Sequence, residues 1–74
     1  METAGRPARS KGIMLPNLKQ ERYRAGLSLR DLAEKSGVKH GTISELETGR
    51  RGAQPRTLRK LADALEVSTK ELVG

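Results

Sequence analysis

The chain has 74 residues, which is enough for one compact domain and too few for two. It contains no cysteine, which excludes disulfides, thiolate zinc sites and cysteine nucleophiles, and its longest apolar run, Ile13-Met14-Leu15, is too short for a membrane span or a secretory signal. The formal net charge is +6, which fits a nucleic acid, an anionic membrane or an acidic protein as partner. From the short apolar runs and the lack of cysteine we expect a soluble, cytoplasmic chain.

The N-terminal region combines a basic segment with the start of the first helix. Residues 1–12 mix Gly, Pro, Ser and positive charge without apolar periodicity, which predicts a flexible basic arm before a domain of residues 13–74. A first helix is expected over about 17–25, with Asn17 as its N-cap and Gly26 as its stop.

The next two predicted helices are short and adjacent in the chain. The earlier one begins at Ser28, which has capping-box spacing with Asp31, and ends at Gly37. The later one covers about 39–48 and ends at Gly49. The junction between them is expected to be filled by four apolar residues, Leu32, Val38, Ile43 and Leu46.

Two more helices complete the predicted set. One begins at Pro55, which suits a first helical turn, and its apolar residues recur at the spacing of an amphipathic helix: Leu58, Leu61, Ala62 and Leu65. A very short last helix begins at Ser68, three residues before Glu71 in a second capping-box pattern. Because no useful alternating strand pattern appears, the sequence predicts an all-α bundle of about five short helices.

Three stretches carry a family resemblance: Leu29-Arg-Asp-Leu-Ala-Glu-Lys-Ser-Gly-Val38, Thr42-Ile-Ser-Glu-Leu-Glu-Thr-Gly49, and Pro55 through Leu65 followed by Val67-Ser68. From about Leu18 to Leu72 the chain resembles the Cro and lambdoid-phage-repressor type of helix-turn-helix domain, the Xre-like family of bacterial and phage regulators. The resemblance implies a lambda-repressor-like fold and a sequence-specific DNA-binding regulator of transcription. A repressor is the kind of regulator that we expect. The resemblance further implies a homodimer on a near-palindromic operator, which reads the major groove with the helix near 39–48.

The resemblance also implies roles for individual residues. Base contacts map onto His40, Gly41, Ser44 and Glu45. Arg56 matches a family position that reaches toward the minor groove, and we expect further phosphate contacts from Lys39, Thr42, Arg50 and Arg51. Arg22 and Glu47 match a partly buried ion pair that ties the first helix to the reading helix.

The chemistry of these residues fits the implied roles. Glu45 can accept a hydrogen bond from a cytosine amino group, and His40 can donate one to a purine N7 or to phosphate. Gly41 is unfavourable inside a helix by about 1 kcal/mol relative to Ala, so either DNA approaches closely there or the first turn is loose. Lys39 replaces the usual Ser or Thr cap, which leaves helix amides available to a phosphate.

Other functions remain open beside this one. Any single charged residue can simply be an exposed, solubilising side chain, and the basic arm can follow the minor groove or be merely disordered. The single histidine, the lack of metal-ligand spacing and the lack of a Gly-rich phosphate loop argue against an enzyme, a metal site or a cofactor. The main rival is a protein-interaction module such as the antitoxin of a toxin–antitoxin pair, and membrane binding ranks last.

Overall fold

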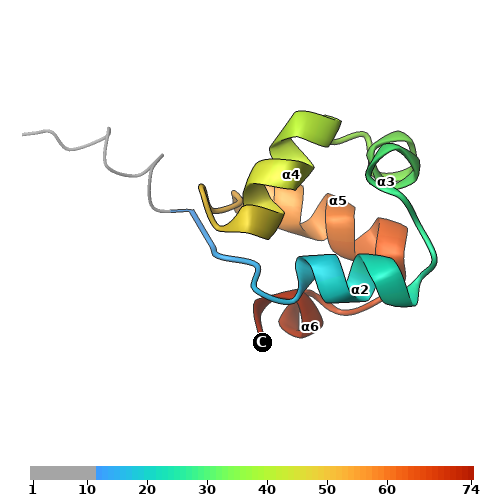
Figure 1. Ribbon diagram of the computed structural model, residues 1–74. Coiled ribbons are helices and arrows are strands. Elements are labelled where there is room, and N and C mark those ends of the chain that lie inside the picture. The colour runs from blue at the N-terminus through green and yellow to red at the C-terminus, as the bar shows by residue number, and fades with distance from the viewer. Residues whose placement is uncertain (1–11) are drawn as a thin grey trace, which may run out of the picture.

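The computed structural model describes residues 12–74, which form five helices and no extended strand (Figure 1). The helices are α2 (Leu18–Arg24), α3 (Leu29–Ser36), α4 (His40–Thr48), α5 (Pro55–Leu65) and α6 (Thr69–Val73). None of these five could cross a membrane, since each is too short and too polar. The expected all-α bundle is confirmed; the basic arm expected over residues 1–12 lies, apart from Gly12, outside the described residues.

The two helices at the centre of the chain begin and end as the sequence predicts. Ser28 and Asp31 form a reciprocal capping box: the Asp31 amide donates to Ser28 Oγ over 3.0 Å, and the Ser28 amide donates to Asp31 Oδ2 over 3.1 Å. The backbone hydrogen bond from Ser28, followed by its hydroxyl, holds the pKa of Asp31 below its usual value. Gly37 and Gly49 then end α3 and α4 in the left-handed region, with φ of 79° at both.

Two predicted side-chain caps are wrong. Asn17 is the N-cap residue of α2, but its side chain donates to the carbonyl oxygen of Glu71 over 3.1 Å, because the start of α2 packs against the end of α6. Ser68 precedes α6 without a side-chain cap, and the Glu71 amide donates instead to the backbone carbonyl of Ser68 over 3.1 Å. The Asn17 side chain thus binds the end of α6, and at Ser68 the backbone carbonyl, rather than the hydroxyl, accepts the hydrogen bond.

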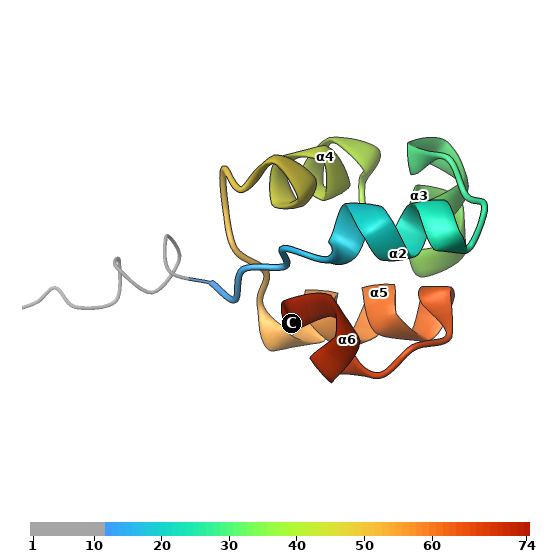
Figure 2. The same cartoon turned by 60° about the horizontal axis from the view of Figure 1, so that its bottom comes forward.

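The core is aliphatic and draws on every helix. Figure 2 shows α3 and α4 on one side and α5 and α6 on the other, with α2 crossing between them. The residues predicted for the junction of α3 and α4 are all buried, as is the apolar stripe of α5. Within residues 12–74 the core consists of Leu15, Leu18, Leu32, Val38, Ile43, Leu46, Ala53, Leu58, Leu61, Ala62, Ala64, Leu65 and Leu72.

An isolated antiparallel bridge fastens the start of the domain to the loop after α4. Ile13 and Ala53 exchange two backbone hydrogen bonds of 2.7 Å each. The preceding glycines lie against each other, and a Cβ on Gly12 would come within 2.6 Å of the carbonyl carbon of Gly52. The sequence does not predict this bridge, because a single pair of residues leaves no periodic pattern.

Candidate nucleic-acid interface

One side of α4 is buried and the other is open to solvent. Ile43 and Leu46 point into the core, and the residues on the opposite side are exposed or half-exposed. At helical spacing these residues form one outward face, which consists of Gly41, Ser44, Glu45 and Thr48, with His40 at its N-terminal edge. The structure therefore brings the four predicted base-contact residues together at this face and edge.

Thr48 also belongs to the outward face, although it is not among the residues predicted to contact DNA. It follows Ser44 by four residues and Glu45 by three, and this spacing was the available signal. Its Oγ1 donates to the carbonyl of Ser44 over 3.1 Å and to that of Glu45 over 3.2 Å. The hydroxyl is thus engaged by the helix itself, and the methyl group is the part of this side chain left for apolar contact.

The N-terminus of α4 has the features of an anion-binding site. Lys39 is the N-cap residue, extended and exposed, and no side chain in the described part of the chain caps the helix. Ile43 donates its amide to the Lys39 carbonyl over 3.0 Å, so the helical hydrogen bonds begin there. The backbone amides that precede Ile43 in the first turn of α4 lack an intrahelical acceptor. The positive end of the helix dipole favours an anion beside them.

The predicted phosphate-contact residues lie around α4 in two settings. Arg50 and Arg51 occupy the loop after α4, and Arg56 lies in the first turn of α5, all three exposed. Arg51 Nη1 donates to Glu45 Oε1 over 3.0 Å, so a predicted phosphate contact and a predicted base contact form a pair with each other. Thr42 is half-buried and lines a groove beside the outward face of α4.

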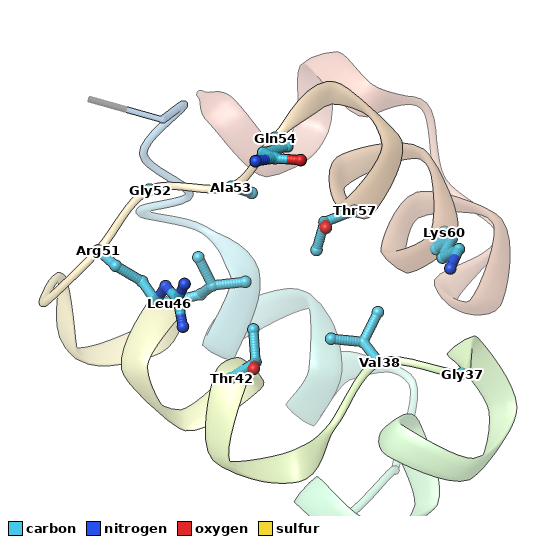
Figure 3. A pocket seen from close by; sticks show the side chains of 10 residues that line it. All are labelled: Gly37, Val38, Thr42, Leu46, Arg51, Gly52, Ala53, Gln54, Thr57 and Lys60. Carbon is cyan, nitrogen blue, oxygen red and sulfur yellow. The ribbon is translucent and has the colours of Figure 1, made fainter. Parts of the chain in front are cut away.

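This groove has a volume of about 440 Å³ and lies between α4 and α5 (Figure 3). Its lining is Gly37, Val38, Thr42, Leu46, Arg51, Gly52, Ala53, Gln54, Thr57 and Lys60. Within the described residues this lining holds two cations and two hydroxyls but no carboxylate or imidazole. Nor does the range 12–74 contain a group of three or more acidic, His or Cys side chains placed to hold a metal.

Arg22 and Glu47 form an ion pair that joins α2 to α4. Arg22 Nε donates to Glu47 Oε2 over 2.6 Å and Nη2 donates to Oε1 over 3.0 Å, while Nη1 donates to the carbonyl of Leu27 over 3.0 Å. The two side chains are only 8% and 6% exposed. The hydrogen bonds to Glu47 raise the pKa of the guanidinium, and the Tyr23 ring lies 4.8 Å from its central carbon.

Gly41 has no structural reason to be glycine within this domain. A Cβ at this position would have no heavy atom of the described chain within 4 Å beyond the helix's own backbone. The backbone there is helical from His40 onward, and Gly41 is absent from the residues with positive φ. The alternative of a loose first turn therefore receives no support from the structure.

Comparison with known proteins identifies the family to which this fold belongs. A family model described as helix-turn-helix matches residues 18–72, which include α2 through most of α6. The chain belongs to the helix-turn-helix family. The resemblance drawn from the sequence is confirmed, with α3 and α4 as the two helices of the helix-turn-helix motif and Gly37 in the turn between them.

Relatives of this helix-turn-helix chain include regulators of known name. It is 42% identical over 59 residues to the HTH-type transcriptional repressor RghR of Bacillus subtilis, a match that covers 78% of this chain and 42% of RghR. The chain thus spans less than half the length of that relative.

Two solved structures have the same fold. The restriction-modification controller protein C.AhdI from Aeromonas hydrophila superposes with a TM-score of 0.73 and 34% identity, over 76% of this chain and 85% of C.AhdI. The Bacillus subtilis biofilm regulator SinR, solved in complex with DNA, superposes with a TM-score of 0.75 and 34% identity, over 78% of this chain and 94% of that structure.

Proposed function

We propose that this helix-turn-helix chain is the sequence-specific, duplex-DNA-binding part of a transcriptional repressor and that α4 reads the major groove. The observation that carries the proposal is the outward face of α4, where small and polar side chains lie beside an uncapped helix N-terminus and a group of exposed arginines. Such a face offers hydrogen-bonding groups to base edges and positive charge to phosphates. The name of RghR and the DNA complex of SinR support the same function.

The proposed contacts follow the geometry. Bases would be read by His40, Gly41, Ser44 and Glu45. Phosphates would be bound by Lys39, Thr42, Arg50, Arg51 and Arg56, with Arg56 reaching toward the minor groove. The groove beside Thr42 supports this arrangement, since its lining contributes positive charge and hydroxyls next to the reading helix.

The proposed functional unit is a domain of residues 13–74 that acts as a homodimer. Its start is placed at Ile13 because that residue pairs with Ala53 and Leu15 is buried. The two copies would bind half-sites about 10 bp apart on a near-palindromic operator. The site of action would be the cytoplasm, on nucleoid DNA, and the proposed activity is binding without catalysis.

Exposed apolar residues separate this function from a protein-interaction module such as an antitoxin. A protein-binding face normally presents aromatic or large aliphatic anchors. Among the described residues, the large apolar side chains that are exposed are Ile13, Met14, Tyr23 and Val73, and all four lie outside α4. The reading helix therefore favours DNA over a protein partner.

Glu45 is expected to set the preference for one base pair in each half-site. Selection from a randomised duplex library should enrich a near-palindromic sequence, and Glu45→Ala should relax one base pair per half-site, because a good base contact discriminates by about 1–3 kcal/mol. Glu66→Ala is the matched control, since this glutamate ends α5 and is 81% exposed. Retention of every sequence alike, or of none, would contradict the proposal.

Gly41→Ala is expected to separate stability from binding. In the free protein it should raise the free energy of unfolding by about 0.5–1 kcal/mol, because alanine is the better helix former and meets no neighbour. On the selected operator it should weaken binding, because a methyl group would stand where the DNA approaches. Urea denaturation and a fluorescence-anisotropy titration measure the two effects; tighter or unchanged binding would show that no close approach occurs there.

A further inference from the structure

The two carboxylates of α4 have different partners. Glu47 lies beneath the surface and pairs with Arg22, whereas Glu45 lies on the outward face and pairs with Arg51. An acidic side chain on a surface that approaches phosphates is repelled by them unless its charge is compensated. The compensation of Glu45 comes from the same chain, at 3.0 Å, before any DNA is bound.

The end of α4 is built so that Arg51 returns to Glu45. Gly49 turns the chain in the left-handed conformation, and the amide of Arg50 then donates to the carbonyl oxygen of Glu45 over 3.0 Å. Figure 3 shows the Arg51 side chain leaving the loop and running back toward α4. The backbone amide of Arg50 therefore binds the backbone carbonyl of Glu45, and the Arg51 guanidinium binds the Glu45 carboxylate.

The pair occupies only part of the carboxylate. Arg51 Nη1 binds Oε1, and no residue between 12 and 74 donates a hydrogen bond to Oε2. Both side chains are about half exposed, at 51% for Arg51 and 47% for Glu45. An exposed pair of this kind adds little to folding stability. Its position on the outward face of α4 therefore points to a role in binding rather than in folding.

We infer that Arg51 is a specificity-positioning residue for DNA recognition: it holds Oε1 of Glu45 and cancels its charge, so that Oε2 accepts the amino group of a cytosine. This inference rests on the proposed function and assigns to Arg51 a role other than a plain phosphate contact. A carboxylate oxygen of fixed direction can accept an amino group at only one position, which makes the base contact selective. The fixed side chain also loses less entropy on binding than a freely rotating one.

Arg50 is the matched control. It neighbours Arg51, carries the same charge and is exposed, and in the described part of the chain its side chain has no ion pair. A general electrostatic contribution should be similar for the two arginines. Of the two arginines, only Arg51 should affect which base is preferred.

The test compares Arg51→Gln, Arg50→Gln, Glu45→Gln and the double variant Glu45→Gln/Arg51→Gln. Dissociation constants are measured for the selected operator and for duplexes changed at the base pair that Glu45→Gln relaxes. Arg51→Gln is expected to reduce discrimination at that base pair by roughly three- to tenfold, and to have no further effect on discrimination in the Glu45→Gln background, as for two residues that act as a unit. Arg50→Gln is expected to weaken binding to all duplexes by one common factor. Thermal melts should be closely similar for all four.

The outcomes distinguish a failure of the role of Arg51 from a failure of the proposed function. If Arg51→Gln weakens every duplex equally, as Arg50→Gln does, Arg51 is a phosphate contact and the inference is overturned while the proposed function stands. If the unmodified chain prefers no sequence, the proposed function fails and the inference fails with it.

Discussion

Glu47→Ala is expected to lower the free energy of unfolding by about 3–5 kcal/mol, because it removes one partner of a buried ion pair. The substitution leaves the Arg22 guanidinium buried with its hydrogen bond to the Leu27 carbonyl and without a counter-charge. Since small domains are stable by only about 5–15 kcal/mol, a loss of this size leaves a substantial unfolded fraction. Urea denaturation followed by circular dichroism measures it.

Two comparisons show whether the effect comes from the buried charge. Lys35→Ala removes one partner of an exposed pair, Lys35 with Glu66 at 3.7 Å, and should change the free energy of unfolding by less than about 1 kcal/mol. The double variant Arg22→Met/Glu47→Leu replaces the pair by apolar groups and should recover most of the stability lost in Glu47→Ala. Equal effects of Glu47→Ala and Lys35→Ala would show that the buried pair has no special weight.

Gly52→Ala is expected to lower the free energy of unfolding by about 1–3 kcal/mol, as overpacking does in other well-packed sites. Its Cβ would overlap the Cα and the carbonyl group of Gly12, which are backbone atoms and cannot rotate away. The bridge between Ile13 and Ala53 must then open, together with the packing of buried Leu15.

Amide hydrogen exchange locates this effect. The amides of Ile13 and Ala53 should lose protection in Gly52→Ala, whereas those in α3 should exchange at rates set by the smaller global stability. Gly41→Ala serves as the control, because the same added methyl meets no neighbour there. Unchanged protection at Ile13 would mean that the two segments separate without loss.

Local signals account for the features that the sequence predicted. The capping box of Ser28 and Asp31 is complete within four residues, and the left-handed ends at Gly37 and Gly49 need only the glycine itself. The apolar stripe of α5 is likewise a property of one segment. The family resemblance predicted which residues lie on the outward face of α4, because the helix-turn-helix motif fixes the orientation of α4 relative to α3.

The features that the sequence missed depend on contacts between distant segments. The side chain of Asn17 is drawn away from its helix by Glu71, 54 residues later. The bridge of Ile13 with Ala53 joins two loops that carry no pattern. The pair of Glu45 and Arg51 is closer in sequence, but its formation depends on the direction in which Gly49 turns the chain, which residue types alone do not specify.

The chain also contains its own optical reporter. It has no tryptophan and no phenylalanine, and its single tyrosine, Tyr23, lies on the solvent side of α2 with the Arg22 guanidinium 4.8 Å from its ring. Ultraviolet emission and near-ultraviolet circular dichroism therefore originate from one ring beside the link between α2 and α4, while the aliphatic core is spectroscopically silent. An unlabelled sample can thus report on the opening of that link separately from the loss of helix seen in the far ultraviolet.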